Sequence, residues 1–333
     1  MVKKKSFIPG FHQAHKNVNF HLFDASVEKC LYKAEHFFIA VAIRSISDIS
    51  DLERAVHENK VPRVDVFSLV HIIGKGDYCV AFRAHAGNPV RAHYAVLFPN
   101  EPRYSAHVRK KARILNRLGQ NAHTTRFIYH GDYRGMPFLA ESYAYPLSRV
   151  IDVGNSSGLR PNIDCFKWFV NDLLVALDYF HAQGNTHGDL HPGNVALGEG
   201  MKVKLIDLDF ASSSVVRSAG LTSGRSVSNG YGVVSGGGAL DYLYAAPEVC
   251  DGAVATPSSD IYSAGAVCFA LLTGRPPQRG EYDVHALRPD LPRWTNSLLA
   301  SMIQRNTHRP SAFQMQQWLR EYVHHDEIMG MTH

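Results

Sequence analysis

The chain has 333 residues, of which 45% are hydrophobic and 20% charged, and its formal net charge is +5. These values are ordinary for a globular protein large enough to bury a substantial core, and so mild a charge gives no reason to expect nucleic-acid binding. The apolar runs at residues 37–43 and 264–272 are too short to cross a bilayer. An odd, scattered set of cysteines without a Cys-x-x-Cys pair predicts reduced thiols in the cytoplasm rather than a disulfide framework or a zinc site.

The first 64 residues form an extension ahead of the main pattern. Residues 50–59 look helical, with Ser50 as the N-terminal cap. Pro62 marks a boundary, because proline stops a helix that precedes it. Two roles are open for this extension: a brace packed on the next lobe, or a piece that binds a partner.

From residue 67 the pattern turns to strands, with further strands predicted at 92–98, 127–133 and 137–143. A helix is predicted at about 105–118, between the strands at 92–98 and 127–133. Residues 161–183 then form a long amphipathic helix, because apolar side chains recur there at helical spacing.

A polar stretch at residues 187–194, reading H-G-D-L-H-P-G-N, is followed by two short apolar runs around a Gly-Glu-Gly turn. Such runs predict a β-hairpin, with Asn194 at its entrance and Asp207 at its exit. The pairing would place an amide oxygen beside a carboxylate, and these two ligands suit Mg²⁺. Asp189 would face the same point and orient or deprotonate a hydroxyl nucleophile. The alternative is a polar loop whose acids only solvate a turn.

The His-Gly-Asp at 187–189, Asn194 and the Asp-Leu-Asp at 207–209 together resemble the catalytic motifs of the protein kinase superfamily. The wording of the stretch is closest to that of aminoglycoside and other small-molecule phosphotransferases, which share the kinase fold. The resemblance implies ATP and Mg²⁺ as cofactors.

The same resemblance implies an α+β, bilobal fold with a small antiparallel sheet lobe and a larger, mainly helical lobe. The expected boundaries follow the chain in order: extension 1–64, small lobe 65–140, large lobe 141–325 and tail 326–333.

Residues 72–81, I-I-G-K-G-D-Y-C-V-A, resemble the glycine-rich loop that covers ATP phosphates. In that loop, missing Cβ atoms let backbone N–H groups approach the phosphate oxygens. Gly74, Gly76 and Tyr78 fit the pattern, whereas Cys79 stands where a third glycine is expected. The alignment would place Cys79 over the nucleotide, within reach of electrophiles.

The next strand departs from the family. Kinases carry Ala-x-Lys there, with the lysine on the α- and β-phosphates, but this chain has Ala95 followed at the lysine position by Leu97. The helix glutamate that normally pairs with that lysine is replaced by Lys111. Losing one charge-assisted hydrogen bond to phosphate costs about 1.5–3 kcal/mol, or about 10–100-fold in binding or rate. Lys111 or Lys75 would supply the missing ammonium; alternatively, each is a solvated surface lysine.

Glu141 is expected to start the hinge whose backbone binds adenine, with Ala140 as the small residue guarding the back of the pocket. Gly188 replaces the arginine through which many protein kinases sense a phosphorylated loop, which disfavours that switch. His191 stands where serine/threonine kinases keep a lysine on the γ-phosphate. Either it hydrogen-bonds that phosphate or it packs within the loop.

The large lobe carries further family features. Residues 212–238 are rich in serine and glycine, which predicts a mobile loop at the activation-segment position, either autophosphorylated or unmodified. Glu248 ends a match to the Ala-Pro-Glu motif, and Asp260 matches the acid that braces the catalytic loop. Arg309 matches the arginine that pairs with Glu248. These features are typical of eukaryotic-type protein kinases.

The leading hypothesis is therefore an ATP-dependent kinase, with Mg²⁺, that acts on serine or threonine of a protein substrate in the cytoplasm. No nucleic-acid partner and no membrane span are expected. The expected catalytic residues are Asp189, Asn194, Asp207 and His191, with Asn194 and Asp207 as metal ligands. The expected nucleotide-binding residues are Gly74, Lys75, Gly76, Tyr78, Ala95, Lys111 and Glu141.

Two other functions remain open. Leu97 and Lys111 favour a pseudokinase, a scaffold with weak or absent nucleotide binding. Gly188 and His191 favour a small-molecule kinase, which the Ala-Pro-Glu motif opposes.

Overall fold

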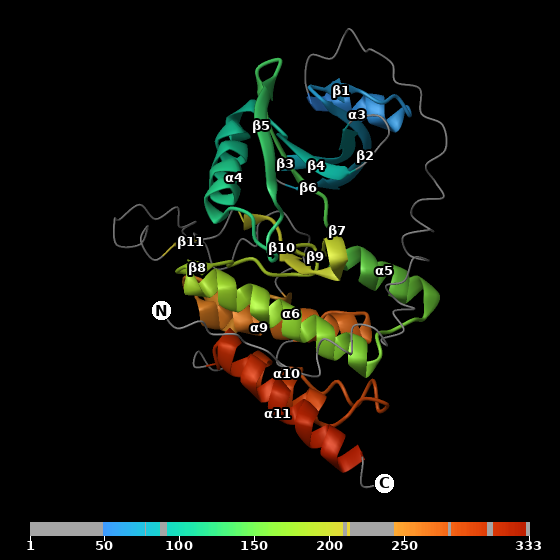
Figure 1. Ribbon diagram of the computed structural model, residues 1–333, viewed down its shortest axis with the longest axis vertical. Helices are drawn as coiled ribbons and strands as arrows, with labels where there is room; N and C mark the ends of the chain where they lie inside the picture. The colour runs from blue at the N-terminus through green and yellow to red at the C-terminus, as the bar shows by residue number, and fades with distance from the viewer. Residues whose placement is uncertain are drawn as a thin grey trace, which may run out of the picture.

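A computed structural model describes residues 49–76, 78–86, 92–208, 212–213, 243–278, 281–304 and 309–330. Figure 1 shows two lobes, a curled sheet with two helices above and a mainly helical lobe below. This is the α+β arrangement that the sequence predicts.

The small lobe is built on a six-stranded sheet in the order β1-β2-β3-β4-β6-β5, and every neighbouring pair is antiparallel. The strands are β1 (Arg63–Val64), β2 (Phe67–Lys75), β3 (Cys79–Ala86), β4 (His93–Pro99), β5 (Phe127–Tyr133) and β6 (Met136–Ser142). The strands predicted at 92–98, 127–133 and 137–143 are confirmed to within a residue or so.

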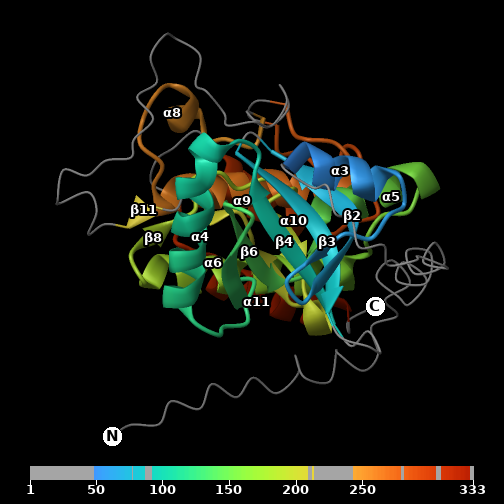
Figure 2. The same cartoon turned by 90° about the horizontal axis from the view of Figure 1, so that it is seen from above.

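Two helices cover opposite faces of this sheet, because successive side chains of a strand point to opposite faces. One face buries Val96 and Ala140 with α3 (Ile49–His57), through Leu52 and Val56. The other face buries residues of β4 and β6 against α4 (Ser105–Leu118). Figure 2 shows the two helices on either side of the sheet.

The described end of the extension is a brace. The helix predicted at 50–59 is present as α3, but Ser50 lies inside it and does not cap it. Leu52 is fully buried against the sheet, and Val64 pairs with Phe67 across β1 and β2. Residues 49–64 therefore belong to the packed small lobe.

The large lobe is organised around two long buried helices, α6 (Ile163–Ala182) and α9 (Pro257–Thr273). Asn162 caps α6 by accepting from the Cys165 N–H at 2.9 Å, and Thr256 forms a capping box at the start of α9. The other helices are α5 (Leu147–Ser157), α8 (Pro247–Cys250), α10 (Trp294–Ile303) and α11 (Ala312–Gly330).

The terminal helix differs from the prediction. A tail was expected at residues 326–333, but α11 continues to Gly330. Its Tyr322 stacks on Trp294 of α10, with ring centroids 6.2 Å apart.

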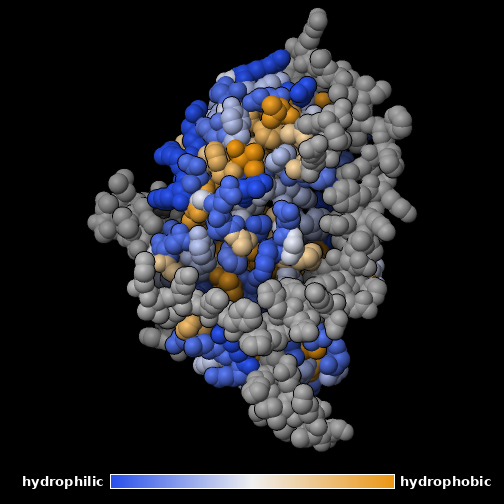
Figure 3. Space-filling model, viewed as in Figure 1, coloured by the Kyte–Doolittle hydropathy of each residue, from blue (hydrophilic) through white to orange (hydrophobic). Residues whose placement is uncertain are grey.

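On the face shown in Figure 3, hydrophilic residues cover most of the small-lobe edge where α4 lies. This agrees with the exposed Arg109, Arg113 and Arg117 of that helix.

Candidate active site

The predicted hairpin is present. β9 (Val195–Leu197) and β10 (Val203–Leu205) pair antiparallel, with Val195 opposite Leu205. The Ile206 N–H extends the pairing by donating to the Asn194 carbonyl at 2.9 Å. Asp207 follows at once with a φ of +57°, a left-handed conformation that is uncommon for a residue other than glycine and is concentrated at functional sites. Asn194 and Asp207 thus leave the same end of one hairpin.

Asp189 lies against Asn194. The Asn194 side-chain amide donates to the Asp189 carbonyl at 2.8 Å and approaches the carboxylate Oδ2 at 3.3 Å. With its NH₂ group used this way, the Asn194 amide oxygen is the atom left for a metal. The structure therefore brings Asp189 and Asn194 into contact and places Asp207 one residue past their hairpin.

The buried carboxylate of Asp260, 1% exposed, anchors the catalytic loop from α9. It accepts the backbone N–H groups of His187 at 2.8 Å and Gly188 at 2.9 Å, and its Oδ2 lies 2.9 Å from His181 Nε2. Gly188 has a φ of +80°, a conformation strained for other residues. The bracing role expected of Asp260 has this geometry; the contact of His181 was not foreseen.

His191 packs within the loop. Its Nδ1 accepts the Gly193 N–H at 3.1 Å, so the neutral ring carries its proton on Nε2. A Cβ at residue 193 would lie 2.7 Å from the His191 ring, which explains why a glycine follows at this spacing. His191 therefore packs within the loop, which was one of its two expected roles. For the other role, donation to a phosphate, Nε2 would be the donor atom.

The glycine-rich loop is the turn between β2 and β3. The Gly76 N–H donates to the Cys79 carbonyl at 2.9 Å, and the Asn100 side chain donates to the Gly76 carbonyl. A Cβ at Gly74 would meet no described atom within 4 Å, and one at Gly76 would meet only the Cys79 carbonyl at 3.8 Å. Packing among the described residues does not require glycine at either position, so the space fits a ligand that approaches the backbone.

Tyr78 closes this loop onto α4. Its ring stacks on His107 at a centroid distance of 4.3 Å and meets Tyr104 edge-on at 5.1 Å. Burial lowers the pKa of the His107 imidazole and Lys110 adds to this, while the Asp207 carboxylate acts in the opposite direction. The inner side of α4 thus faces the end of the hairpin that carries Asp207.

Comparison with known proteins agrees with this geometry. The family model described as the protein kinase domain matches residues 67–323. The chain belongs to the protein kinase family.

Two relatives of this kinase-family chain are named serine/threonine-protein kinases. It is 34% identical to the probable serine/threonine-protein kinase PknB of Bifidobacterium longum, over 45% of this chain and 20% of the relative. It is 24% identical to serine/threonine-protein kinase ksg1 of Schizosaccharomyces pombe, over 65% of this chain and 37% of the relative. The chain thus spans well under half of the length of these relatives.

The fold has solved counterparts. The crystal structure of the Mycobacterium tuberculosis PknI kinase domain matches with a TM-score of 0.53 at 19% identity, covering 78% of this chain and 97% of that one. At this identity the match establishes the kinase fold alone.

The cation expected on the kinase strand is missing, as the sequence indicates. Leu97 is buried, 6% exposed, in the core that packs β4 against α4. Of the two replacement lysines, Lys75 lies on the opposite face, where its Nζ pairs with Glu53 of α3 at 2.7 Å. Lys111 is the candidate on the side of Leu97.

Lys111 is part of a buried cluster that the sequence does not reveal. Its Nζ lies 3.5 Å from Glu141 Oε1, and both side chains are 6% exposed. The Thr125 hydroxyl donates to Glu141 Oε2 at 2.8 Å. The surface alternative for Lys111 is therefore wrong.

The back of the kinase cleft also differs from the expectation for Ala140. Ala140 pairs with Val96, and both face the α3 side of the sheet. Glu141 pairs with Ala95, so these two side chains share the α4 face. Glu141 is still within β6 and does not begin the hinge, and its side chain, rather than the methyl of Ala140, lies on the α4 face of the sheet.

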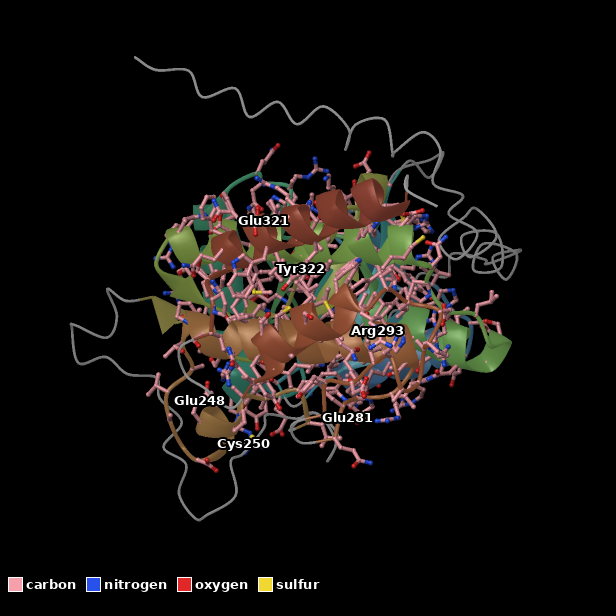
Figure 4. The ribbon with its side chains drawn as sticks, turned by 90° about the horizontal axis from the view of Figure 1, so that it is seen from below. Glu248, Cys250, Glu281, Arg293, Glu321 and Tyr322 are labelled. Atoms are coloured by element: carbon pink, nitrogen blue, oxygen red, sulfur yellow. The ribbon has the colours of Figure 1, made fainter. Side chains whose placement is uncertain are left out.

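The ion pair between Glu248 and Arg309 has the expected partners. Arg309 donates from Nη1 to Glu248 Oε1 at 2.6 Å and from Nη2 to Oε2 at 3.2 Å. The Arg309 side chain is fully buried, with its guanidinium carbon 4.9 Å from the Tyr262 ring centroid. Figure 4 shows Glu248 on α8 at one edge of the large lobe, well apart from Tyr322 on α11.

Some predicted features lie outside the described residues. They include Asp209 and most of the serine- and glycine-rich segment, of which only the backbone of Ser212 and Ser213 is described, paired with β8 (Asn185–Thr186). Across the ranges that are described, no helix is long and apolar enough to span a membrane.

Proposed function

We propose that the chain is an ATP-dependent kinase that transfers the γ-phosphate of ATP to serine or threonine hydroxyls of a protein substrate. The observation that carries the proposal is the contact of Asp189 with Asn194 at the open end of the hairpin from which Asp207 emerges. The names of the two relatives given above, both serine/threonine-protein kinases, support the class of hydroxyl. The cysteine pattern supports a cytoplasmic location.

The described residues fit ATP and Mg²⁺. Asn194 and Asp207 offer hard oxygen ligands from adjacent strand ends, which is the donor set Mg²⁺ prefers, with phosphate oxygens and water completing it. The open space at Gly74 and Gly76 suits close approach of phosphates. When bound, Mg²⁺ supplies charge neutralisation on the phosphates.

The chain's own residues supply positioning. Asp189 orients the substrate hydroxyl and accepts its proton, held in place by Asn194 and by the anchored loop. His191, on the same loop, would donate from its Nε2 to the γ-phosphate. Tyr78 closes the glycine-rich loop on α4. Ala95, on the α4 face of β4, would contact the nucleotide base. The backbone that follows β6, after Ser142, would bind adenine.

Phosphotransfer with a matched pair of variants tests the proposal. Wild-type protein is incubated with γ-labelled ATP, Mg²⁺ and a mixed lysate, and label on serine and threonine is counted. Asp189→Asn should abolish transfer while ATP still binds. Asp164→Asn, an exposed carboxylate at the start of α6, is the control and should keep full activity. Wild-type protein that labels no more than Asp189→Asn would exclude the enzyme.

A pseudokinase scaffold is the second candidate, and the buried Leu97 is the observation that favours it. The discriminating measurement is the melting temperature with ATP and Mg²⁺. A ligand bound at 100 times its Kd stabilises the folded state by about 2.7 kcal/mol. A rise in the melting temperature supports the enzyme, and no change supports the scaffold.

A further inference from the structure

The buried cluster of Lys111, Glu141 and Thr125 is the feature that the proposed function leaves unexplained. We propose that Glu141, supported by Thr125, is a positioning residue that holds the Lys111 ammonium at the base of the cleft, so that α4 supplies the phosphate-binding cation absent at Leu97. The inference rests on the proposed function, since it assigns the source of a charge that ATP binding needs.

The first step is the shared face. Leu97 pairs with Leu139, and Ala95 pairs with Glu141, across β4 and β6. Leu97 and Glu141 therefore point to the same side of the sheet, which is the side packed by α4. An ammonium bound to Glu141 lies on the face where a strand lysine would have extended.

The second step is the closeness of the cluster to the catalytic hairpin. Thr125 follows Thr124, which forms a parallel bridge with Leu205 of β10, and the Leu205 N–H donates to the His123 carbonyl at 2.8 Å. Leu205 is two residues before Asp207. On α4, His107 lies one turn before Lys111, on the same helix face, and is near enough to Asp207 to feel its charge. The loop that carries Thr125 thus adjoins β10, which leads into Asp207, and Lys111 lies one turn along α4 from His107.

The third step is the chemistry of the cluster. Two buried charges persist only when they are paired and hydrogen-bonded. Thr125 binds one oxygen of Glu141 and Lys111 the other, so both carboxylate oxygens are engaged. An ammonium has three N–H donors, which lets Lys111 keep Glu141 while it donates to a phosphate oxygen. Glu141 thereby holds the ammonium on the α4 face of the sheet.

In the usual kinase ion pair the strand carries the lysine and the helix carries the glutamate. The cluster exchanges these positions. The cation is on the helix and the anion is on a strand, so the ion pair still joins α4 to the sheet. Lys75 cannot take this role in the described structure, because its Nζ is bound to Glu53 on the α3 face.

The test compares the affinities of ATP with Mg²⁺ and of adenosine, both measured by calorimetry. Any loss of folded protein weakens both ligands alike, so the ratio of the two affinities reports only on the phosphates. The variants are Lys111→Met, Lys111→Arg, Glu141→Gln and Thr125→Val. Arg113→Met, which removes an exposed cation from the same helix, is the matched control.

Lys111→Met should lower the ratio of ATP to adenosine affinity by about 10–100-fold, as expected for one charge-assisted hydrogen bond to phosphate. Lys111→Arg should retain most of the ratio, because the charge is kept. Glu141→Gln and Thr125→Val should lower it less than Lys111→Met, and Arg113→Met should leave it unchanged.

The inference is overturned if wild-type protein binds ATP with Mg²⁺ and the ratio is unaltered in Lys111→Met and Glu141→Gln; the proposed function would then stand. If wild-type protein binds adenosine and ATP equally, or neither, both the inference and the proposed function fail.

Discussion

Asp260 offers the sharpest test of how the large lobe supports catalysis. Its carboxylate accepts two backbone N–H groups of the catalytic loop, from His187 and Gly188, and contacts His181. Asp260→Ala leaves both N–H groups buried without an acceptor, at about 1–3 kcal/mol each. The expected loss in free energy of unfolding is therefore about 2–6 kcal/mol. Asp260→Asn keeps one acceptor oxygen and turns an NH₂ toward donors, so it should lose less.

The functional effect is expected through Asp189, which directly follows the two anchored residues. A shift of about 1 Å in a catalytic group costs about 100-fold in rate. Urea unfolding gives the stability, and phosphotransfer per folded molecule gives kcat. Asp260→Asn should lower kcat far more than it lowers the affinity for ATP.

The control for losing a buried carboxylate is Asp172→Asn. Asp172 accepts the Val203 N–H at 2.8 Å and binds Lys202, at the turn end of the hairpin and not at the end that carries Asn194 and Asp207. The Asp172→Asn variant should have a lower free energy of unfolding than the wild type but the same kcat per folded molecule. If Asp260→Asn keeps wild-type kcat, or if Asp172→Asn lowers kcat as much, the reasoning that Asp260 positions the loop is refuted.

Three further outcomes are expected. Breaking the buried pair with Glu248→Gln should cost about 3–5 kcal/mol in unfolding free energy. Burial acts to raise the pKa of Glu248, but the hydrogen bond and charge of Arg309 outweigh it and hold that pKa below the ordinary 4.5. The stabilisation from the ion pair is therefore present above pH 4.5 and is lost as the pH falls through the lowered pKa. The melting temperatures of wild-type protein and Glu248→Gln should converge in acid. Gly193→Ala should lower kcat, because the new Cβ displaces the His191 ring, and His191→Ala should then have little further effect; additive losses would contradict this. Lys75→Met should change ATP affinity by less than about fivefold, since Lys75 is paired with Glu53 and an exposed ion pair contributes about 0.2–1 kcal/mol; a larger loss would place Lys75 at the phosphates.

Local features of this fold could be predicted because they depend on nearby residues. The Gly-Glu-Gly turn between two apolar runs predicts the hairpin that presents Asn194, and the structure has it. The helix predicted at about 105–118, after the strand that lacks the lysine, is present with those bounds. The predicted start of the tail at residue 326 was wrong, because the sequence has no proline or glycine to stop α11 before Gly330.

The parity of β6 could not be predicted, and it decides what lines the cleft. A shift of one residue in a strand exchanges its two faces. The motif places Ala140 at the back of the pocket, whereas the pairing of Glu141 with Ala95 puts Glu141, and not Ala140, on the α4 face of the sheet. The partner of Lys111 is 30 residues away in the chain, and only the packing of α4 on β6 brings the two together.

The central claim is that oxygen atoms of Asn194 and Asp207 hold a metal-bound nucleotide. The magnesium dependence of ATP binding tests this claim most directly. Calorimetric titration of ATP would be done with Mg²⁺ and with EDTA, on wild-type protein and on Asp207→Asn. We expect wild-type protein to bind ATP more tightly with Mg²⁺, and Asp207→Asn to lose that gain. Equal affinity with and without Mg²⁺ in wild-type protein, or an undiminished gain in Asp207→Asn, would contradict the account.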